Sequence, residues 1–305
     1  MLSKPYLRRL SVADVGQVAD LHRDYYPYRN AEILKWQFFD PDLPCESVIM
    51  GVFDGAKLVG SQGFIPVNAW WEGKEILACQ SELTLLLPPY RGGDIFKKLY
   101  NAGIERCEQE GFACVFGFTT AVKPFASVGF DILEPWYLEL LVLNPVRFLT
   151  SMLNKRNGWV PPPALPAYDV PQELMDAKDG TFGLRRDHKY IKHWYVNNPN
   201  RFIVYFDRLG GVLYTAGYNK SVVFISEITR LELLEASVKR AVKGRRRQWV
   251  SLCRKTNHPS LGAFSIPGAI RVVRHRGNLI FRWIGTFRRY DTPKIFSEEG
   301  YVEVL

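Results

Sequence analysis

The chain has 305 residues, of which 47% are hydrophobic and 23% charged; it is long enough for two domains and too rich in core-forming residues for a disordered protein. No apolar segment reaches the roughly eighteen residues that a membrane helix needs, and residues 1–5 open no signal-like apolar run, so we expect a cytoplasmic protein without a membrane span. The five cysteines are odd in number and never spaced C-x-x-C. This pattern favours reduced thiols over a disulfide framework or a zinc site, and we expect no metal.

The net charge of +9 is divided unevenly along the chain. Residues 1–145 hold 13 Lys and Arg against 18 Asp and Glu, whereas the remaining residues hold 27 against 13. Such asymmetry predicts that the second half faces something anionic, for which the phosphates of a small molecule suffice.

The first 135 residues show an ordered series of strand and helix signals. A short strand at 6–10 is followed by Ser11-Val12-Ala13-Asp14, a capping sequence that predicts the start of a helix. Strand patterns follow at 47–53, 57–64, 67–71, 76–87 and 114–118. The apolar residues of 95–110 repeat at helical spacing, and 122–128 reads as a shorter helix.

Residues 157–171 contain five prolines, a density that prevents regular hydrogen bonding and favours an extended spacer. We therefore expect a first domain at 1–150, a linker at 151–172 and a second domain at 173–305. A long surface loop within one domain is the alternative.

Short sequence matches recur in the same order in both halves. Trp36 and Trp194 each stand five residues before a proline, and each is followed by a strand–turn–strand pattern that ends near a glycine. Further on, Ser81-Glu82-Leu83-Thr84 is answered by Ser226-Glu227-Ile228-Thr229. The repeated order predicts a degenerate duplication.

The most specific chemical signal is the loop Pro88-Pro89-Tyr90-Arg91-Gly92-Gly93-Asp94-Ile95-Phe96, which joins an apolar strand to a helix. The first amides of a helix are unpaired, glycine lets a phosphate approach the backbone, and the helix dipole adds positive potential. The loop therefore predicts an anion site. It has neither the G-K-[ST] of a Walker loop nor the G-x-G-x-x-G of a dinucleotide fingerprint.

This loop resembles that of the GNAT superfamily of acyl-CoA N-acyltransferases, which reads [Q/R]-x-x-G-x-[G/A] and commonly P-x-Y-R-G-x-G-I. The residues that match in register are Pro88, Tyr90, Arg91, Gly92 and Ile95. The element order and the Gly-Phe ending at Gly129-Phe130 agree over residues 5–135. The resemblance implies an α+β fold with a mixed, mostly antiparallel sheet flanked by helices, in two tandem GNAT-like domains. Two positions depart: Asp94 replaces the central glycine and would repel a pyrophosphate, and Phe96 replaces a small residue.

The same resemblance implies coenzyme A or acyl-CoA as the cosubstrate. The free backbone of the strand at Leu85, Leu86 and Leu87 would bind the pantetheine arm, and one of its N–H groups would stabilise the oxyanion as an amine attacks. The pyrophosphate would lie on Arg91, Gly92, Gly93, Asp94, Ile95 and Phe96. No cysteine is placed as a nucleophile, so we expect direct attack in a ternary complex.

Glu82 is our candidate for the general base, because some GNAT enzymes use a carboxylate four residues before the position of Leu86. The corresponding residue of the second repeat, Glu227, lies in a half without the loop, so a structural role shared by both glutamates is an equal alternative. The general acid that would protonate the leaving thiolate of CoA is missing at its usual place. The family often has a tyrosine four residues before Gly-Phe, and this residue is Phe125 here. Solvent and Tyr137 are the remaining sources of that proton.

The second half lacks a copy of the loop, so we expect one active site in the first half, with the second half shaping the acceptor pocket. Two basic groups stand out there: Lys239, Arg240, Lys243, Arg245, Arg246 and Arg247, and then Arg271, Arg274, His275, Arg276 and Arg282. The first either ends a solvated helix or binds a diphosphate, and the second is expected on exposed strand faces.

Tandem GNAT-like chains of this size are similar to bacterial N-acyltransferases that act on nucleotide-linked amino sugars for surface polysaccharides. The expected partners are therefore acyl-CoA and a small amine, and a nucleic acid is not expected. A Fem-type transferase that uses aminoacyl-tRNA and a non-catalytic CoA- or sugar-binding protein are the alternatives. The sequence leaves the acyl chain and the oligomeric state open, a dimer being one option.

Overall fold

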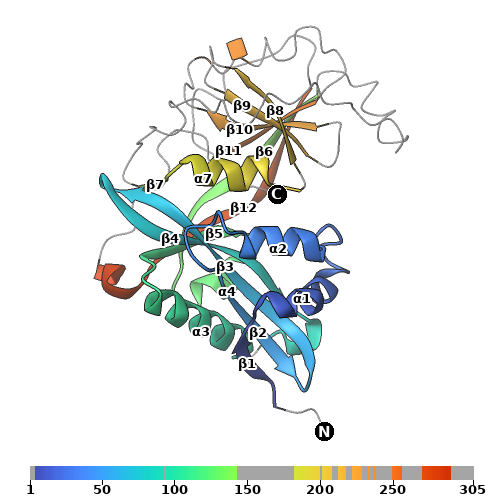
Figure 1. Cartoon of the computed structure of the whole chain (residues 1–305), viewed down its shortest axis with the longest axis vertical. Coiled ribbons are helices and arrows are strands. Elements are labelled where there is room, and N and C mark those ends of the chain that lie inside the picture. The colour runs from blue at the N-terminus through green and yellow to red at the C-terminus, as the bar shows by residue number, and fades with distance from the viewer. Residues whose placement is uncertain are drawn as a thin grey trace. The chain divides into compact units, whose positions relative to one another are not determined.

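The computed structural model describes residues 4–92, 94–142, 182–199, 201–207, 212–217, 222–228, 233, 236–237, 249–255 and 270–289; in several strands only the backbone is described. The chain divides into two compact units (Figure 1). Unit 1 comprises residues 1–133, 182–185 and 278–295, and unit 2 comprises 134–181, 186–277 and 296–305. The proline-rich segment 151–172 lies outside the described residues, so the domain boundary expected there stays a prediction.

Unit 1 is built on a mixed, mostly antiparallel sheet flanked by helices, as the sequence predicted. Its neighbouring strands are, in order, β1 (Tyr6–Arg9), β2 (Val48–Asp54), β3 (Lys57–Trp71), β4 (Lys74–Leu86), β5 (Cys114–Thr119) and β12 (Ile270–Trp283). Among these described strands of unit 1, only β4 and β5 pair in parallel. They are joined through α3 (Ile95–Gln109), in keeping with the long crossover that a parallel pair requires.

The two faces of this sheet are covered by different helices (Figure 1). Alternate residues of a strand point to opposite faces, so the neighbours Gly63 and Phe64 of β3 contact different helices. A Cβ at Gly63 would meet the ring of Phe38 from α2 (Ala31–Phe39), whereas Phe64 reaches α3 at Gly103. The helix α1 (Val15–His22) lies on the α2 side, where the capping box of Ser11 precedes it as expected.

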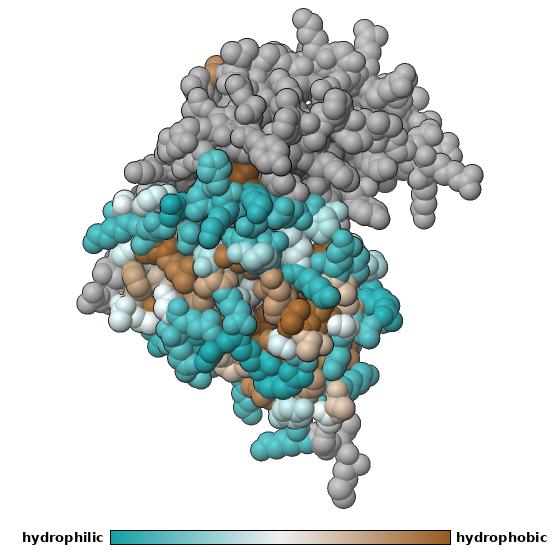
Figure 2. Space-filling model, viewed as in Figure 1, coloured by the Kyte–Doolittle hydropathy of each residue, from teal (hydrophilic) through white to brown (hydrophobic). Residues whose placement is uncertain are grey.

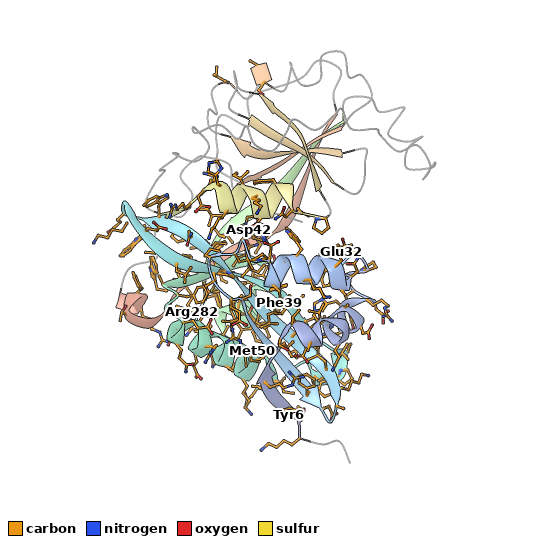
Figure 3. The ribbon with its side chains drawn as sticks, viewed as in Figure 1. Tyr6, Glu32, Phe39, Asp42, Met50 and Arg282 are labelled. Atoms are coloured by element: carbon orange, nitrogen blue, oxygen red, sulfur yellow. The ribbon has the colours of Figure 1, made fainter. Side chains whose placement is uncertain are left out.

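The core on the α3 face is aromatic. Tyr100 of α3 is fully buried and contacts the rings of Phe64, Phe125 and Phe130. Phe125 belongs to α4 (Val122–Ala126), the short helix predicted from the sequence. Met50 of β2, labelled in Figure 3, packs in the same cluster. On the face shown in Figure 2, hydrophilic residues border the apolar patches of unit 1.

One prediction about the strands was wrong: the strands expected at 57–64 and 67–71 are a single strand, β3. Pro66 interrupts the sequence pattern without ending the strand. On one flank β3 pairs with β2 up to Phe64 and with β7 (Phe182–Leu184) from Ala69 onward. Pro66 lies between these partners, where that flank has no partner strand among the described residues, so a residue without an N–H group is tolerated.

The described strands of unit 2 repeat the pairing order of unit 1. The helical segments α7 (His188–Ile191) and η4 (Lys192–Val196) precede β8 (Arg201–Asp207), β9 (Val212–Gly217) and β10 (Val222–Ile228), which pair antiparallel. Then β10 pairs in parallel with β11 (Trp249–Lys255), and β11 pairs antiparallel with β6 (Asp131–Val142).

The last strand of each unit comes from the other half of the sequence. Residues 136–141 of β6 pair with β11 of unit 2, whereas residues 278–283 of β12 pair with β5 of unit 1. Residues 278–295 therefore group with unit 1, although the sequence placed them in the second half.

In the described part of the chain Cys45, Cys79, Cys107 and Cys114 are free thiols, and the side chain of Cys253 is not described. Burial raises the pKa of Cys45 to about 11, and it also raises the pKa of Cys114. No helix in the described part of the chain is long and apolar enough to cross a membrane. The described residues also contain no cluster of three or more His, Cys, Asp or Glu that could hold a metal.

Candidate active site

The predicted anion loop lies between β4 and α3, and two side-chain hydrogen bonds help to hold it. A short 3-10 turn, Pro88–Tyr90, leads out of β4, and the Tyr90 hydroxyl donates to Asp54 Oδ2 over 2.6 Å. Arg91 Nε donates to the carbonyl of Leu86 over 2.8 Å, which ties the loop back to its own strand. Tyr90 and Arg91 thus fix both the start and the direction of the turn.

The middle of the loop is open. Gly92 has φ of +92°, a left-handed conformation that favours glycine, and an added Cβ would meet no atom within 4 Å. Gly93 lies outside the described residues. An anion could therefore approach the backbone at Gly92 without a side chain in its way.

The start of α3 offers the amides that the sequence predicted. Asp94 is the N-cap residue, is exposed, and makes no side-chain hydrogen bond to the first turn. A capping aspartate usually accepts one of these amides, so here they stay available to a ligand. Lys97 and Lys98 are exposed in the same turn and add positive charge.

The side chains of Ile95 and Phe96 do not face an anion; both pack against the hydrophobic core. The Phe96 ring lies 4.9 Å from that of Tyr100 and 5.7 Å from that of Phe125. The large residue at this position is therefore accommodated by the core, and only its backbone remains for the loop.

The strand before the loop separates from its parallel neighbour. β4 pairs with β5 only from Ala78 to Gln80, and among the described residues its later positions have no partner on that side. On the other side, Leu85 and Leu86 still pair with β3, and both are buried. Leu87 is half-buried. Beyond Gln80 this flank of β4 thus has no partner strand among the described residues, although the Leu86 carbonyl accepts from Arg91 and the Leu87 N–H donates to the Val59 carbonyl of β3. Pantetheine binding at this edge stays a prediction.

Glu82 stands at the start of this free edge and is held by a partly buried ion pair. Arg29 Nη2 lies 3.0 Å from Glu82 Oε2, and the two side chains are only 13% and 14% exposed. Gln80 Nε2 donates to the other carboxylate oxygen over 3.3 Å. Sequence reasoning did not find Arg29, because 53 residues separate it from its partner.

The segment between α1 and α2 brings exposed tyrosines to the same place. Tyr25, Tyr26 and Tyr28 are 41%, 36% and 45% exposed. The Arg29 guanidinium lies 4.8 Å from the ring of Tyr26, and that of Arg91 lies 5.7 Å from the ring of Tyr25. These contacts join the tyrosine segment to both the carboxylate and the anion loop. Three tyrosines within a short polar stretch were a signal in the sequence that went unused.

The structure offers no tyrosine at the position of the missing acid. Phe125 is 5% exposed and belongs to the aromatic core, so it packs and does not donate a proton. The side chain of Tyr137 lies outside the described part of β6.

Among the basic groups, the run at 239–247 lies outside the described residues. Arg282, labelled in Figure 3, was expected on an exposed strand face but is half-buried, and its guanidinium donates to the Val128 carbonyl. Burial, together with the charge of Arg288, lowers its pKa. For the other members of its group, only the backbone is described.

Residues 6–133 match the family model described as an acetyltransferase (GNAT) domain. No curated protein matches the chain. Solved structures similar to it include a GCN5-related N-acetyltransferase from Kribbella flavida (14% identity, 92% of this chain and 71% of that one, TM-score 0.61), a GCN5-related N-acetyltransferase from Anabaena variabilis (11%, 92% and 72%, 0.58) and Eis1 from Mycobacterium abscessus (13%, 92% and 73%, 0.53). At these identities the likeness establishes the fold. The chain therefore carries a GNAT acetyltransferase domain, that of an acyl-CoA-dependent enzyme, at residues 6–133.

Proposed function

We propose that this chain transfers an acyl group from acyl-CoA to the amine of a nucleotide-linked amino sugar, using the single site at the end of β4. The observation that carries the proposal is the continuity of this site. β4 leaves β5 after Gln80, passes the ion-paired Glu82, and runs as a free edge into the open loop at Gly92.

Each part of this edge supports one part of the reaction. The pyrophosphate of CoA would bind the amides of residues 91–96, and the pantetheine arm would pair with the backbone at 85–87. A backbone N–H of β4 would then donate to the thioester oxygen as negative charge develops on it. Glu82 would take the proton of the attacking amine, and because Phe125 cannot supply one, solvent would protonate the leaving thiolate.

The tyrosine segment supports an acceptor with flat or weakly polar faces. Exposed tyrosine rings can stack on sugar rings and on nucleobases. Tyr26 and Tyr28 lie against Arg29, the ion-pair partner of the proposed base, and Tyr25 lies against Arg91 of the loop. The excess of positive charge in residues 146–305 suits the diphosphate of a nucleotide-linked sugar.

We propose further that unit 2 is a degenerate copy of unit 1 with the last strands exchanged. The support is the repeated pairing order, antiparallel through three strands, then parallel, then antiparallel. A copy without the loop would leave one CoA site in the protein.

Thiol release tests the proposal directly. Purified protein is mixed with acetyl-CoA or a longer acyl-CoA, and free CoA is measured with nucleotide-linked amino sugars, free amino sugars, amino acids and a peptide amine. The matched control is the same nucleotide sugar with a hydroxyl in place of the amine. We expect CoA release only with an amine, fastest with the nucleotide-linked sugar. Equal rates with free amino sugars would show that the site does not recognise the nucleotide. Binding of CoA, with no release of free CoA from acyl-CoA in the presence of any amine, would overturn the proposal.

A further inference from the structure

A buried histidine is linked to β4 by a chain of hydrogen bonds that the proposed chemistry does not use. His22, the last residue of α1, is 0% exposed, and its Nε2 lies 2.9 Å from Ser61 Oγ. Ser61 of β3 is also 0% exposed, and its hydroxyl donates to the carbonyl of Leu83 over 2.9 Å. The chain thus crosses from a helix through one strand to the next.

The direction of this chain is fixed by its chemistry. A hydroxyl has one proton, and Ser61 gives it to a carbonyl, which can only accept. His22 must therefore donate from Nε2, which leaves Nδ1 unprotonated; Nδ1 has no hydrogen-bond partner among the described residues. Burial, with a smaller contribution from the charge of Arg29, lowers the pKa of His22 to about 3, so the imidazole is neutral near pH 7 and this tautomer persists.

The carbonyl at the end of the chain belongs to a bulge in β4. Glu82 pairs with Gly63 and Leu85 pairs with Ser61, so Leu83 and Thr84 together stand opposite a single residue of β3. Leu83 has φ of +62°, which costs a leucine about 1–2 kcal/mol. Its side chain is only 1% exposed, so the surrounding packing and the hydrogen bond from Ser61 have to hold this conformation.

The bulge lies between the two parts of β4 that the reaction needs. Glu82 precedes it, and the free edge at Leu85 and Leu86 follows it. A rotation of the Leu83 peptide would turn the Glu82 side chain and the N–H groups of the next residues together, because one backbone carries both.

We propose that His22 and Ser61 are positioning residues for acyl transfer: through the Leu83 carbonyl they hold the bulge that aims Glu82 and the following backbone at the thioester. The inference rests on the proposed function. Neither side chain reaches the surface, so neither touches substrate.

Variants of His22 separate the donated proton from mere packing. In His22→Gln the side-chain amide nitrogen lies near the position of Nε2 and can still donate to Ser61. In His22→Asn the amide nitrogen lies near the position of Nδ1, so Ser61 loses its donor. We expect His22→Asn to lower kcat about 10- to 100-fold and to raise the KM for acyl-CoA by a smaller factor, because the same backbone would bind the pantetheine arm, and His22→Gln to recover most of the rate. A His22→Gln variant as slow as His22→Asn would overturn the role of the donor.

Ser61→Ala removes the second link and should match His22→Asn. Ser47→Ala is the control, since Ser47 is also a buried serine, 2% exposed, and its hydroxyl has no partner among the described residues. We expect Ser47→Ala to keep the wild-type kcat. If Ser61→Ala keeps it as well, the chain does not position the site.

Amide hydrogen exchange gives a readout that does not depend on turnover. We expect faster exchange in residues 82–86 of Ser61→Ala and His22→Asn, with unchanged exchange in α3 and wild-type rates in Ser47→Ala. If the wild-type protein transfers no acyl group but exchange in residues 82–86 is faster in Ser61→Ala and His22→Asn, the proposed function fails. The conclusion that His22 and Ser61 hold the bulge is then still supported. If wild-type protein is active and the exchange in these variants is unchanged, the positioning inference fails.

Discussion

The charge around the anion loop can be changed by single substitutions, and the affinity for CoA should follow it. Gly92→Glu places a carboxylate at the open point of the loop. At about 5 Å from a phosphate, one added charge costs about 1 kcal/mol at the dielectric constant of water and about 3 kcal/mol at an effective value of 20. We therefore expect CoA to bind roughly 5- to 200-fold more weakly, measured by isothermal titration calorimetry.

The chain supplies a matched control for this variant. Gly111 lies just past the other end of α3, has φ of +85° against +92° for Gly92, and also has no atom within 4 Å of an added Cβ. Gly111→Glu therefore places a glutamate at a similar positive φ, which costs about 1–2 kcal/mol as in Gly92→Glu, and makes the same change in net charge. It should leave the affinity for CoA near that of the wild type.

A negative charge can also be removed from the loop, at Asp94, two residues after Gly92. Asp94→Asn removes a negative charge at the helix start while keeping a good N-cap residue, so CoA should bind about fivefold more tightly at low salt and less so at high salt. Wild-type affinity in Gly92→Glu, or an equal loss in Gly111→Glu, would refute the assignment of the pyrophosphate to this loop.

Three further substitutions test the base, the packing and an ion pair. Glu82→Gln should lower kcat about 100-fold in the thiol-release assay, whereas Glu227→Gln, at the matching position of the echo, should not; equal rates for both would make Glu82 structural. Gly103→Ala puts a Cβ 2.3 Å from a buried phenylalanine ring and should lower the free energy of unfolding in urea by about 1–3 kcal/mol. Asp14→Asn removes the charged hydrogen bonds from Arg8 that lower the Asp14 pKa to about 2. The carboxylate stabilises the fold above pH 4 and loses this contribution as the pH falls to 2, so the variant should be about 1–2 kcal/mol less stable at pH 7 and equal to wild type below pH 2.

The elements of unit 1 could be predicted because their signals are local. The apolar spacing of 95–110 predicted a helix, and α3 runs from Ile95 to Gln109. The capping sequence at Ser11 and the short helix before Gly129 were likewise found within a few residues of chain. Where the pattern was interrupted, as at Pro66, local reasoning ended a strand that the neighbouring strands allow to continue.

The surroundings of the candidate base could not be predicted, because they depend on contacts between distant parts of the chain. Nothing in the sequence near Glu82 indicates an arginine 53 residues earlier, and Arg29 reaches it only because the segment after α1 folds back over β4. His22 is a similar case: alone on a helix end, it gains its role from Ser61, 39 residues away.

The echo between Ser81-Glu82-Leu83-Thr84 and Ser226-Glu227-Ile228-Thr229 gains a physical meaning from the strand pairing. In unit 1 the register of β4 shifts beside Glu82, and in unit 2 the register of β10 shifts between Ile225 and Glu227. Both repeats thus fall at a backbone irregularity, and an irregularity can persist in a copy that has lost its chemistry. The irregularities lie on opposite sides of the glutamate, after Glu82 in β4 and before Glu227 in β10, so the repeat marks a similar but not identical strand geometry. The chemistry that we propose for Glu82 depends on the loop and the free edge that follow it in unit 1 alone among the described residues.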